Sequence, residues 1–254
     1  MATITVLQHG HPIRTSQGII GFCSTYLIRG EKTTLVDVGH VGRRNSLIAA
    51  LAAEGVEPGD IETVLLTHAH WDHAQNIDLF PNAELLLHPW ERKYAAAPHP
   101  NDWATPAWTG AMLETHPKIR EVEEGFDVEP GVMAIHTPGH SPGCLTVLVE
   151  NEGTTDAITG DVLHYGTVAL TKVNPLVFWN ENDATRSIER ILDVADVIYP
   201  GHDRPFRVVG DKIEYQAAQQ MRVFGLDPGD PGTVFDASER PVWIMPGIED
   251  QTIG

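Results

Sequence analysis

Three imidazoles and a carboxylate lie within six residues of one another, in the order His68, His70, Asp72 and His73. They directly follow the apolar run Val64-Leu65-Leu66, and short apolar runs of this kind indicate buried strands. We therefore expect a strand, then a tight loop, then a helix that opens at Asp72. Residues two apart in extended backbone point to the same side, so His68 and His70 share one direction. Asp72 and His73 are adjacent and must face a second point. Such a loop can contribute ligands to two neighbouring metal ions.

Three later turns each place one metal-binding type of side chain after a glycine. They are Gly139-His140, Gly160-Asp161 and Gly201-His202, and each follows a predicted strand. Glycine lets the backbone turn sharply or approach a ligand closely. A lone histidine in such a turn is more often structural. Three such turns downstream of the first loop are hard to explain without a metal, and a two-metal site needs more ligands than the first loop supplies.

The order H-x-H-x-D-H, then T-P-G-H-S-P-G, then G-D, then P-G-H resembles the metallo-β-lactamase-fold hydrolases over about residues 20–210. The resemblance implies the α/β class and a four-layer αβ/βα sandwich, with the site at one edge of two sheets. It also implies two Zn²⁺ ions per chain, with iron or manganese as alternatives. The first zinc would be held by His68, His70 and His140. The second would be held by Asp72, His73 and His202, with Asp161 bridging the pair.

Within this superfamily the chain is most similar to the metallo-β-lactamase domain-containing protein 1 group. The stretches that carry this similarity are residues 76–81, 195–202 and 205–208. The animal member of the group is associated with RNA processing, which so acidic a chain does not favour.

The reaction class that these residues imply is metal-assisted hydrolysis, in which a hydroxide attacks an ester, lactone or thioester of a small molecule. Asp72 would orient the hydroxide, and His164 or Tyr165 would polarise the scissile group. Lactonases of the superfamily commonly carry a tyrosine three residues after the bridging aspartate, where this chain has His164. Adjacent strand residues point oppositely, so only one of the two can face the metals. A phosphodiesterase or ribonuclease of the same fold and an iron-dependent sulfur dioxygenase-like oxidoreductase remain alternatives.

The charge composition of the chain argues against nucleic acid as its binding partner. The 17 basic residues face 35 acidic ones, a net charge of −18, whereas nucleic-acid binding draws most of its affinity from Lys and Arg. We expect a small-molecule substrate, no nucleic acid, no membrane and a cytoplasmic location, and a homodimer is compatible with the sequence. Cys23 and Cys144 are too few for a disulfide framework and are expected to be buried thiols rather than ligands.

We expect one domain over residues 1–225 and a turn-rich C-terminal extension over 226–254 that packs on the domain or on a partner. Helices are predicted over 43–54 and 183–194, the second with Asn182 or Asp183 as its N-cap.

The segment 88–118, with Trp90, Trp103 and Trp108, is either a surface loop or a wall over the site. We expect a second wall from 164–180, which includes Phe178 and Trp179. Asp37 follows a strand, and we expect it to accept a hydrogen bond from a ligand histidine.

Overall fold

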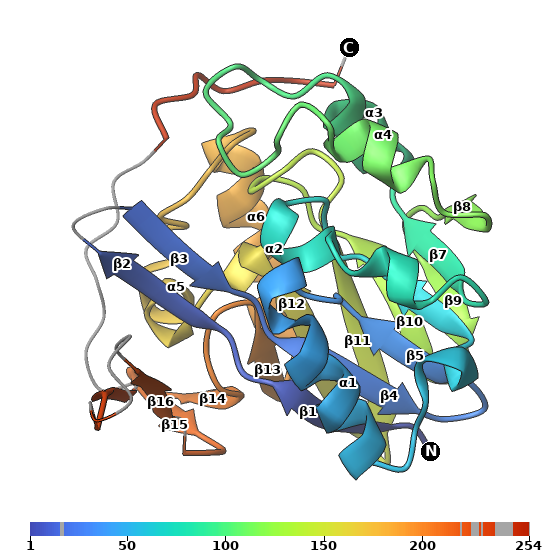
Figure 1. The fold of residues 1–254 in the computed structure, drawn as a ribbon. Coiled ribbons are helices and arrows are strands. Elements are labelled where there is room, and N and C mark those ends of the chain that lie inside the picture. Colours follow the sequence, from blue (N-terminus) through green and yellow to red (C-terminus); the bar gives the residue numbers. More distant parts are fainter. Residues whose placement is uncertain (16–17, 219, 225–228, 230, 237–245, 254) are drawn as a thin grey trace.

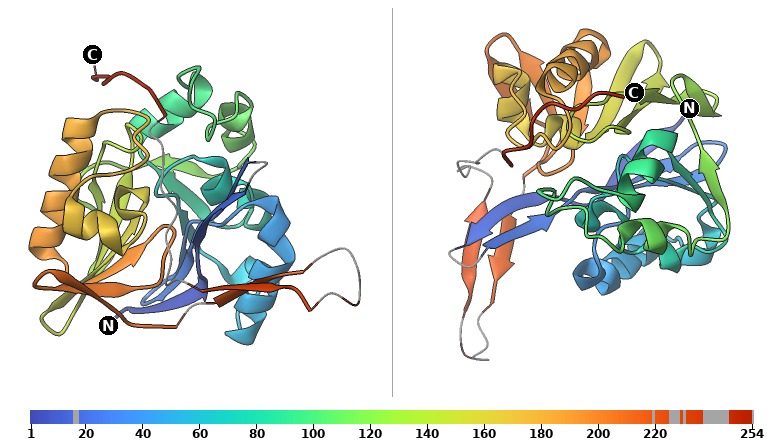
Figure 2. Two further views of the ribbon diagram at one scale, coloured as in Figure 1. Left: turned by 90° about the vertical axis from the view of Figure 1, so that its left-hand side faces the viewer. Right: turned by 90° about the horizontal axis from the view of Figure 1, so that it is seen from above.

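Two β-sheets pack face to face, and helices cover the outer face of each (Figures 1 and 2). The structure is a computed structural model that describes residues 1–15, 18–218, 220–224, 229, 231–236 and 246–253. The layers therefore run helix, sheet, sheet, helix, and the predicted four-layer αβ/βα sandwich is confirmed.

The first sheet has six strands in the order β1-β4-β5-β6-β7-β8. Their bounds are Thr3–Gln8, Thr25–Arg29, Thr33–Val36, Thr63–Leu65, Glu84–Leu87 and Ile119–Glu121. β1, β4 and β5 pair antiparallel, and β5, β6, β7 and β8 pair parallel. Parallel strands end at a common edge, so Asp37 after β5 and the histidine loop after β6 emerge side by side.

The second sheet has seven strands in the order β15-β14-β13-β12-β11-β10-β9. Their bounds are Lys212–Tyr215, Phe206–Val209, Val197–Pro200, Thr154–Gly160, Leu145–Asn151, Val132–His136 and Phe126–Glu129. Neighbours pair antiparallel except β12 and β13, which are parallel and align Gly160 with Pro200. This parallel pair brings Asp161 and His202 to one edge.

Two hairpins stand apart from the sheets: β2 (His11–Thr15) with β3 (Gly18–Phe22), and β16 (Gln220–Val223) with β17 (Thr233–Asp236). The sequence analysis missed both. The β2–β3 hairpin extends away from the first sheet on the side of α2 and α5 (Figure 1).

The helices are α1 (Arg44–Ala53), α2 (Trp71–Ala74), α3 (Pro89–Ala96), α4 (Thr109–Leu113), α5 (Gly166–Thr171) and α6 (Glu181–Val194). Short 3₁₀ turns span Val41–Arg43, Pro58–Asp60, Ile77–Leu79 and Asp161–Leu163. α1 confirms the helix predicted over 43–54. α6 starts earlier than predicted, because the side chain of Asn180 is the N-cap and accepts the N–H of Asp183 at 2.9 Å.

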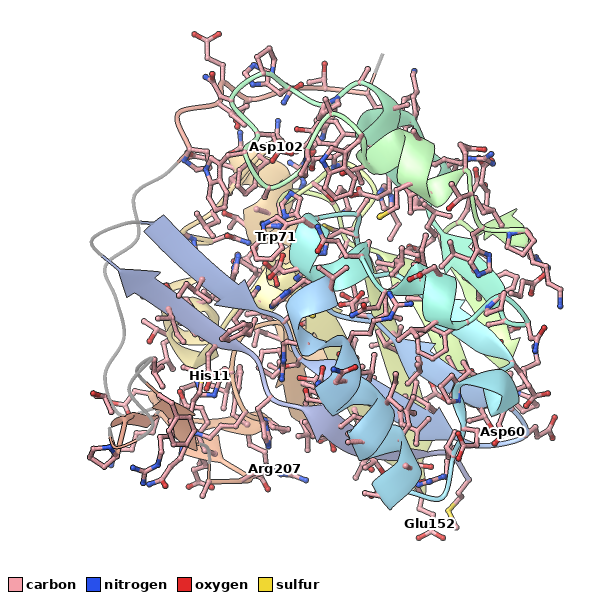
Figure 3. The ribbon with its side chains drawn as sticks, viewed as in Figure 1. His11, Asp60, Trp71, Asp102, Glu152 and Arg207 are labelled. Atoms are coloured by element: carbon pink, nitrogen blue, oxygen red, sulfur yellow. The ribbon has the colours of Figure 1, made fainter. Side chains whose placement is uncertain are left out.

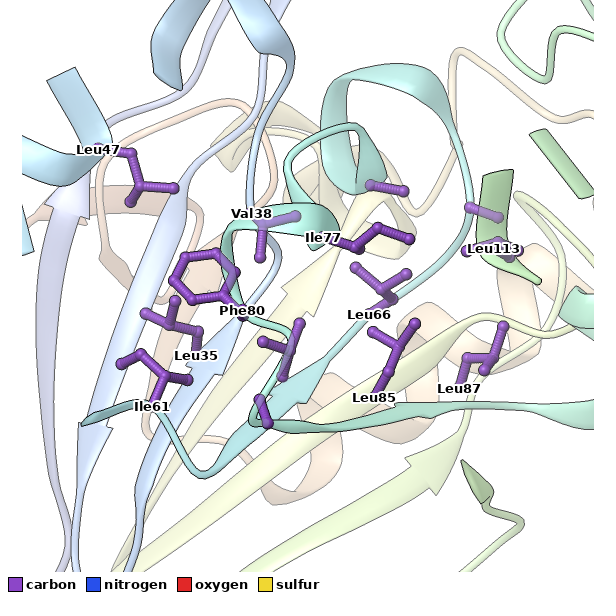
Figure 4. Packing of buried hydrophobic residues seen from close by; sticks show 14 of the residues in the cluster. Leu35, Val38, Leu47, Ile61, Leu66, Ile77, Phe80, Leu85, Leu87 and Leu113 are labelled. Atoms are coloured by element: carbon purple, nitrogen blue, oxygen red, sulfur yellow. The ribbon is translucent and has the colours of Figure 1, made fainter. Parts of the chain in front are cut away.

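Successive side chains along each strand point to opposite faces of the sheet, so the hydrophobic core consists of several separate clusters. Val36, Leu65 and Leu86 point between the two sheets, where they meet Leu145, Val147 and Ile158 of the second sheet. Their neighbours in the strands face outward instead and pack beneath α1 and the Ile77–Leu79 turn with Leu47 and Phe80 (Figure 4). A third cluster lies between the second sheet and α5 and α6, with Val168, Ile188 and Ile191. Period-two alternation thus supplies both faces of each strand with a core.

No helix among the described residues combines the length and apolar character that crossing a bilayer requires. The predicted boundary near residue 225 falls at residues 225–228, which lie outside the described part of the chain, so it stays a prediction.

Candidate metal centre

The histidine loop is held at the edge of the first sheet by the strand that precedes it. Leu66 continues the apolar run and donates its N–H to the carbonyl of Leu86 at 2.9 Å, so the loop leaves the sheet beside β7. α2 begins at Trp71 with His70 as its N-cap, one residue before the predicted helix start. The expected sequence of strand, loop and helix is therefore confirmed.

Two glycines bring the other turns close to this loop. Gly160 has φ +50°, and a Cβ there would lie 2.4 Å from Oγ1 of Thr67. A Cβ on Gly201 would lie 2.0 Å from Oδ1 of Asp161. The first position requires a left-handed backbone and the second a close approach, which are the two uses of glycine expected from the sequence.

The structure brings all seven predicted ligands together, and all seven are buried. They form two groups, in each of which the potential ligand atoms lie within 4.8 Å of one another: His68, His70, His140 and Asp161 in the first, and Asp72, His73 and His202 in the second. Oδ1 of Asp161 lies 3.3 Å from Nε2 of His73, and its Oδ2 lies 3.2 Å from Nε2 of His202. Asp161 therefore stands between the groups.

Ring nitrogens converge in the first group. Nε2 of His140 lies 3.2 Å from Nε2 of His68 and 3.0 Å from Nδ1 of His70. Nδ1 of His140 faces the carbonyl oxygen of Leu176 at 2.6 Å, and Nδ1 of His68 faces Oγ1 of Thr67 at 3.0 Å. When the outer nitrogens carry the protons, unprotonated nitrogens point at one another, an arrangement that a shared cation stabilises.

Buried polar atoms without hydrogen bonds indicate a cation site at the second group as well. Nε2 of His73 in this group and Oδ1 of Asp161 between the groups lie 3.3 Å apart, and both are buried without a hydrogen bond. Leaving buried polar atoms unpaired is costly unless a ligand satisfies them. Imidazole nitrogens and carboxylate oxygens are the donors that zinc accepts, so the residues present fit a metal pair.

The pKa values of His68 and Asp161 also favour metal binding. Burial, followed by the neighbouring His73 and His70, holds the pKa of His68 well below its usual value, which favours the neutral ring that binds metal. Burial alone would raise the pKa of Asp161, but His202, His164 and His73 lower it well below its usual value. The pKa of His140 is lowered in the same way, so two neutral imidazoles lie beside a carboxylate held in its charged form, whereas nearby acidic groups raise the pKa values of His70, His73 and His202 against the effect of burial.

Carboxylates behind the ligands orient them. Oδ2 of Asp37 lies 2.8 Å from Nδ1 of His73, as expected from the sequence. Oδ2 of Asp102 lies 3.6 Å from Nε2 of His70. Asp102 also accepts hydrogen bonds from the hydroxyls of Tyr94 and Thr105. The sequence analysis did not single out Asp102. Its position in the tryptophan-containing segment was the only available signal.

Glu91 was also missed, and it joins two ligand-bearing loops. Its carboxylate accepts the N–H of Ala69 at 2.8 Å, the hydroxyl of Ser141 at 2.6 Å and the N–H of Gly143 at 3.0 Å. Cys144 is buried beside it, 3.0 Å from the Ser141 hydroxyl, and belongs to neither ligand group. Both cysteines are buried thiols, as predicted.

His164 and Tyr165 diverge, as two adjacent residues must. Nε2 of His164 lies 3.1 Å from Oδ2 of Asp161, and His164 lines the cavity at the centre. Tyr165 is not among the cavity residues and packs in the cluster beneath α5 and α6. Of the two candidates for polarising a substrate, the structure places only His164 at the site.

The cavity has walls from three segments. Pro12 and Gly21 come from the β2–β3 hairpin, Trp103 and Ala104 from the 88–118 segment, and Leu176 and Phe178 from 164–180, with Trp71 beside them. Both predicted walls are present, but three tryptophans expected in them, Trp90, Trp108 and Trp179, do not line the cavity. Trp108 is half exposed and lies outside the cavity, and Trp179 lines a separate groove with Trp90 and Tyr94. Trp71 and Asp102 lie at the same end of the molecule (Figure 3).

Several known proteins are similar to this chain in sequence. The profile of the metallo-beta-lactamase superfamily matches residues 18–202. Metallo-beta-lactamase domain-containing protein 1 of Rattus norvegicus is 35% identical over 191 residues, which cover 71% of this chain and 65% of that protein. An N-acyl homoserine lactonase of Bacillus thuringiensis is 29% identical over 166 residues, 62% of each chain.

Solved structures show the same fold. A variant of the B. thuringiensis protein AiiA, with N-decanoyl-L-homoserine bound at its active site, superposes with a TM-score of 0.63 at 20% identity and covers 80% of this chain and 92% of that one. The predicted resemblance to the metallo-β-lactamase domain-containing protein 1 group is confirmed, and the family profile and the lactonase relative agree with the expected enzyme class, a metal-dependent hydrolase. From the family profile and the shared fold we conclude that this chain belongs to the metallo-beta-lactamase superfamily.

Proposed function

We propose that the chain is a dinuclear zinc hydrolase that cleaves an ester, lactone or thioester of a small, uncharged or weakly anionic molecule. One observation carries the proposal: two ligand groups lie side by side at the end of a cavity whose other walls are mainly apolar. Cavities of this composition suit small organic ligands with a few polar groups.

His68, His70 and His140 would hold one ion and Asp72, His73 and His202 the other, with Asp161 between them. When bound, such a pair supplies Lewis acidity and lowers the pKa of water, so that a hydroxide nucleophile is available near neutral pH. Iron and manganese accept the same ligands and remain the alternatives to zinc.

The chain's own residues then position the substrate. Asp72 lines the cavity and can accept a hydrogen bond from the attacking water. Nε2 of His164 faces Oδ2 of Asp161 at 3.1 Å, whereas its Nδ1 is buried without a hydrogen-bond partner, so an N–H at Nδ1 would be available for the carbonyl oxygen of the scissile bond. A fixed donor of this kind stabilises the negative charge that develops on that oxygen. The apolar remainder of the substrate would lie against Trp103, Leu176 and Phe178.

Among the described residues that line the cavity there is no lysine or arginine. A phosphodiester or RNA backbone would meet no cationic side chain among them, which favours a small-molecule substrate over the ribonuclease alternative. The lactonase relative supports a lactone within the proposed class.

Elemental analysis of the purified protein, followed by a screen of lactones, thioesters, esters, β-lactams and phosphodiesters, tests the proposal. We expect two equivalents of zinc and turnover of an ester, lactone or thioester. The variant His70→Ala should lose metal and activity together, whereas His99→Ala, outside both ligand groups, should retain both. A protein that takes up no zinc, or binds a single iron and oxidises a thiol substrate, would contradict it.

A further inference from the structure

The C-terminal segment 246–253 packs on the cavity wall, although it lies outside the residues that the superfamily profile matches. Ile248 contacts a buried cluster formed by Ala104, Leu176 and Phe178. All three members of this cluster line the cavity, and Ile248 does not. Ile248 therefore contacts residues of the wall without lining the cavity itself.

Hydrogen bonds tie the same segment to the backbone that carries Phe178. The N–H of Gln251 donates to the carbonyl of Trp179 at 2.8 Å, and its side-chain amide donates to the carbonyl of Phe178 at 3.1 Å. The side chain of Asn180 donates back to the carbonyl of Gln251 at 3.0 Å. The segment is therefore anchored by three hydrogen bonds beside a wall of the cavity. Figure 1 shows the segment crossing the top of the molecule next to the loop between α3 and α4.

Phe178 connects this support to the metal centre. Its ring meets that of His70 edge-on at 4.8 Å between centroids and that of His140 at 5.4 Å. A shift of Phe178 would change the width of the cavity directly beside the first ligand group. Ile248 packs against the cluster that contains Phe178, and Gln251 donates to its carbonyl, and neither residue lines the cavity.

We propose that Ile248 sets which acyl or alkyl groups the cavity admits, by fixing Phe178 and Leu176 from behind. The inference rests on the proposed hydrolase function. Removing a side chain behind a wall leaves volume into which the wall can relax. The cavity of an Ile248→Ala variant should therefore accept longer apolar chains than the wild type.

The test compares Ile248→Ala with Ile253→Ala, an exposed isoleucine of the same segment that contacts no cluster. Hydrolysis of p-nitrophenyl esters from acetate to decanoate is measured on the zinc-loaded proteins. We expect Ile248→Ala to raise the ratio of kcat/KM for decanoate over acetate by about tenfold, the scale of discrimination that a pocket achieves for small changes in volume. Ile253→Ala should keep the wild-type ratio, and both variants should keep their zinc.

If Ile248→Ala lowers Tm but leaves this ratio unchanged, the residue is packing only and the inference is overturned. Should Ile248→Ala fail to fold, Ile248→Val must shift the ratio in the same direction by a smaller factor, and an unchanged ratio again overturns the inference. If the wild type hydrolyses no ester, the proposed function has failed, and the wall is judged by calorimetric binding of acetate and decanoate to the same zinc-loaded proteins. If wild type and Ile248→Ala then bind decanoate and acetate with the same ratio of affinities, or bind neither acid, the inference is overturned.

Discussion

Nδ1 of His73 lies 2.8 Å from Oδ2 of Asp37, and the hydroxyl of Thr67 donates to the same oxygen at 2.8 Å. The second oxygen of Asp37 accepts the N–H of Thr67 at 2.8 Å. Asp37 therefore fixes both the start of the histidine loop and the ring of His73, with the proton on Nδ1 and the lone pair of Nε2 toward Asp161. This is the arrangement that a metal ligand requires.

Replacing Asp37 by Asn should weaken zinc binding by about 10–100-fold, the usual effect of losing a carboxylate behind a ligand histidine. The backbone should tolerate the change, because Asp37 has φ 57° and Asn adopts this conformation readily. Zinc affinity is measured by competition with a chelator. Asp127→Asn, an exposed carboxylate on β9, serves as the control, and equal affinities in the two variants would contradict the role given to Asp37.

Of the tryptophans in the 88–118 segment, only Trp103 should matter for the substrate. Trp103 lines the cavity and packs edge-on against Phe178 at 5.5 Å, whereas Trp108 is equally exposed but lies elsewhere. Trp103→Ala should raise KM for apolar esters severalfold while zinc content is unchanged, because it removes a wall and no ligand. Trp108→Ala and Trp179→Ala should leave KM unchanged. A KM effect of Trp179→Ala as large as that of Trp103→Ala would place the substrate in the other groove.

Local motifs explain why the ligands were predictable. Each of the seven lies in a short stretch that follows a strand visible in the sequence, and a glycine directly precedes three of them, so strand ends and ligands could be inferred together. The choice between Phe178 and Trp179 could not be made in this way. The two are adjacent and aromatic, and the tertiary packing alone decides which ring faces the cavity.

The β2–β3 hairpin was missed because its sequence carries weak strand signals. Pro12, Gly18 and Gly21 are poor strand residues, and the segment lacks the alternation of apolar and polar side chains by which a strand is recognised. Gly21 has a use there: a Cβ at this position would lie 3.0 Å from Oδ2 of Asp72. Glu91 and Asp102 were missed for a different reason, since the ligand-bearing loops that they contact are distant from them in sequence.

The stacked pair His88 and His136 should make stability depend on pH. Their rings lie parallel, 3.9 Å apart, and burial together with the neighbouring His136 lowers the pKa of His88 to about 4. Between pH 6.5 and about 4, His88 is therefore protonated in the unfolded chain and neutral in the folded chain. This contribution to stability is fully present above pH 6.5 and is lost as pH falls, at no more than about 1.4 kcal/mol per pH unit.

Urea unfolding of wild type and His88→Gln between pH 7 and pH 4 measures this contribution. The wild type should lose more stability across this range than the variant, since the other titrating groups are common to both. Parallel stability curves for the two proteins would show that His88 is not the group responsible.

Glu91 gives the last prediction, because one buried carboxylate holds the loops of His68, His70 and His140 together. Burial raises its pKa, whereas the hydrogen bonds from Ser141, Ala69 and Gly143 oppose that shift. All three partners donate, so only an acceptor fits between them. In Glu91→Gln the amide group must turn its N–H₂ toward either Ala69 or the Ser141 and Gly143 pair, and one side loses its bond.

We expect Glu91→Gln to lower the free energy of unfolding of the zinc-free protein by about 1–3 kcal/mol, the cost of an unsatisfied buried polar group. It should also weaken zinc binding at the first ligand group, because the distance between the two histidine loops is no longer fixed. Ser141→Ala removes one donor and leaves both backbone donors paired, so its effects should be smaller and of the same sign. Urea unfolding and zinc titration of the three proteins test this order. If Ser141→Ala proved as damaging as Glu91→Gln, the hydroxyl would carry the connection and the two backbone hydrogen bonds would contribute little.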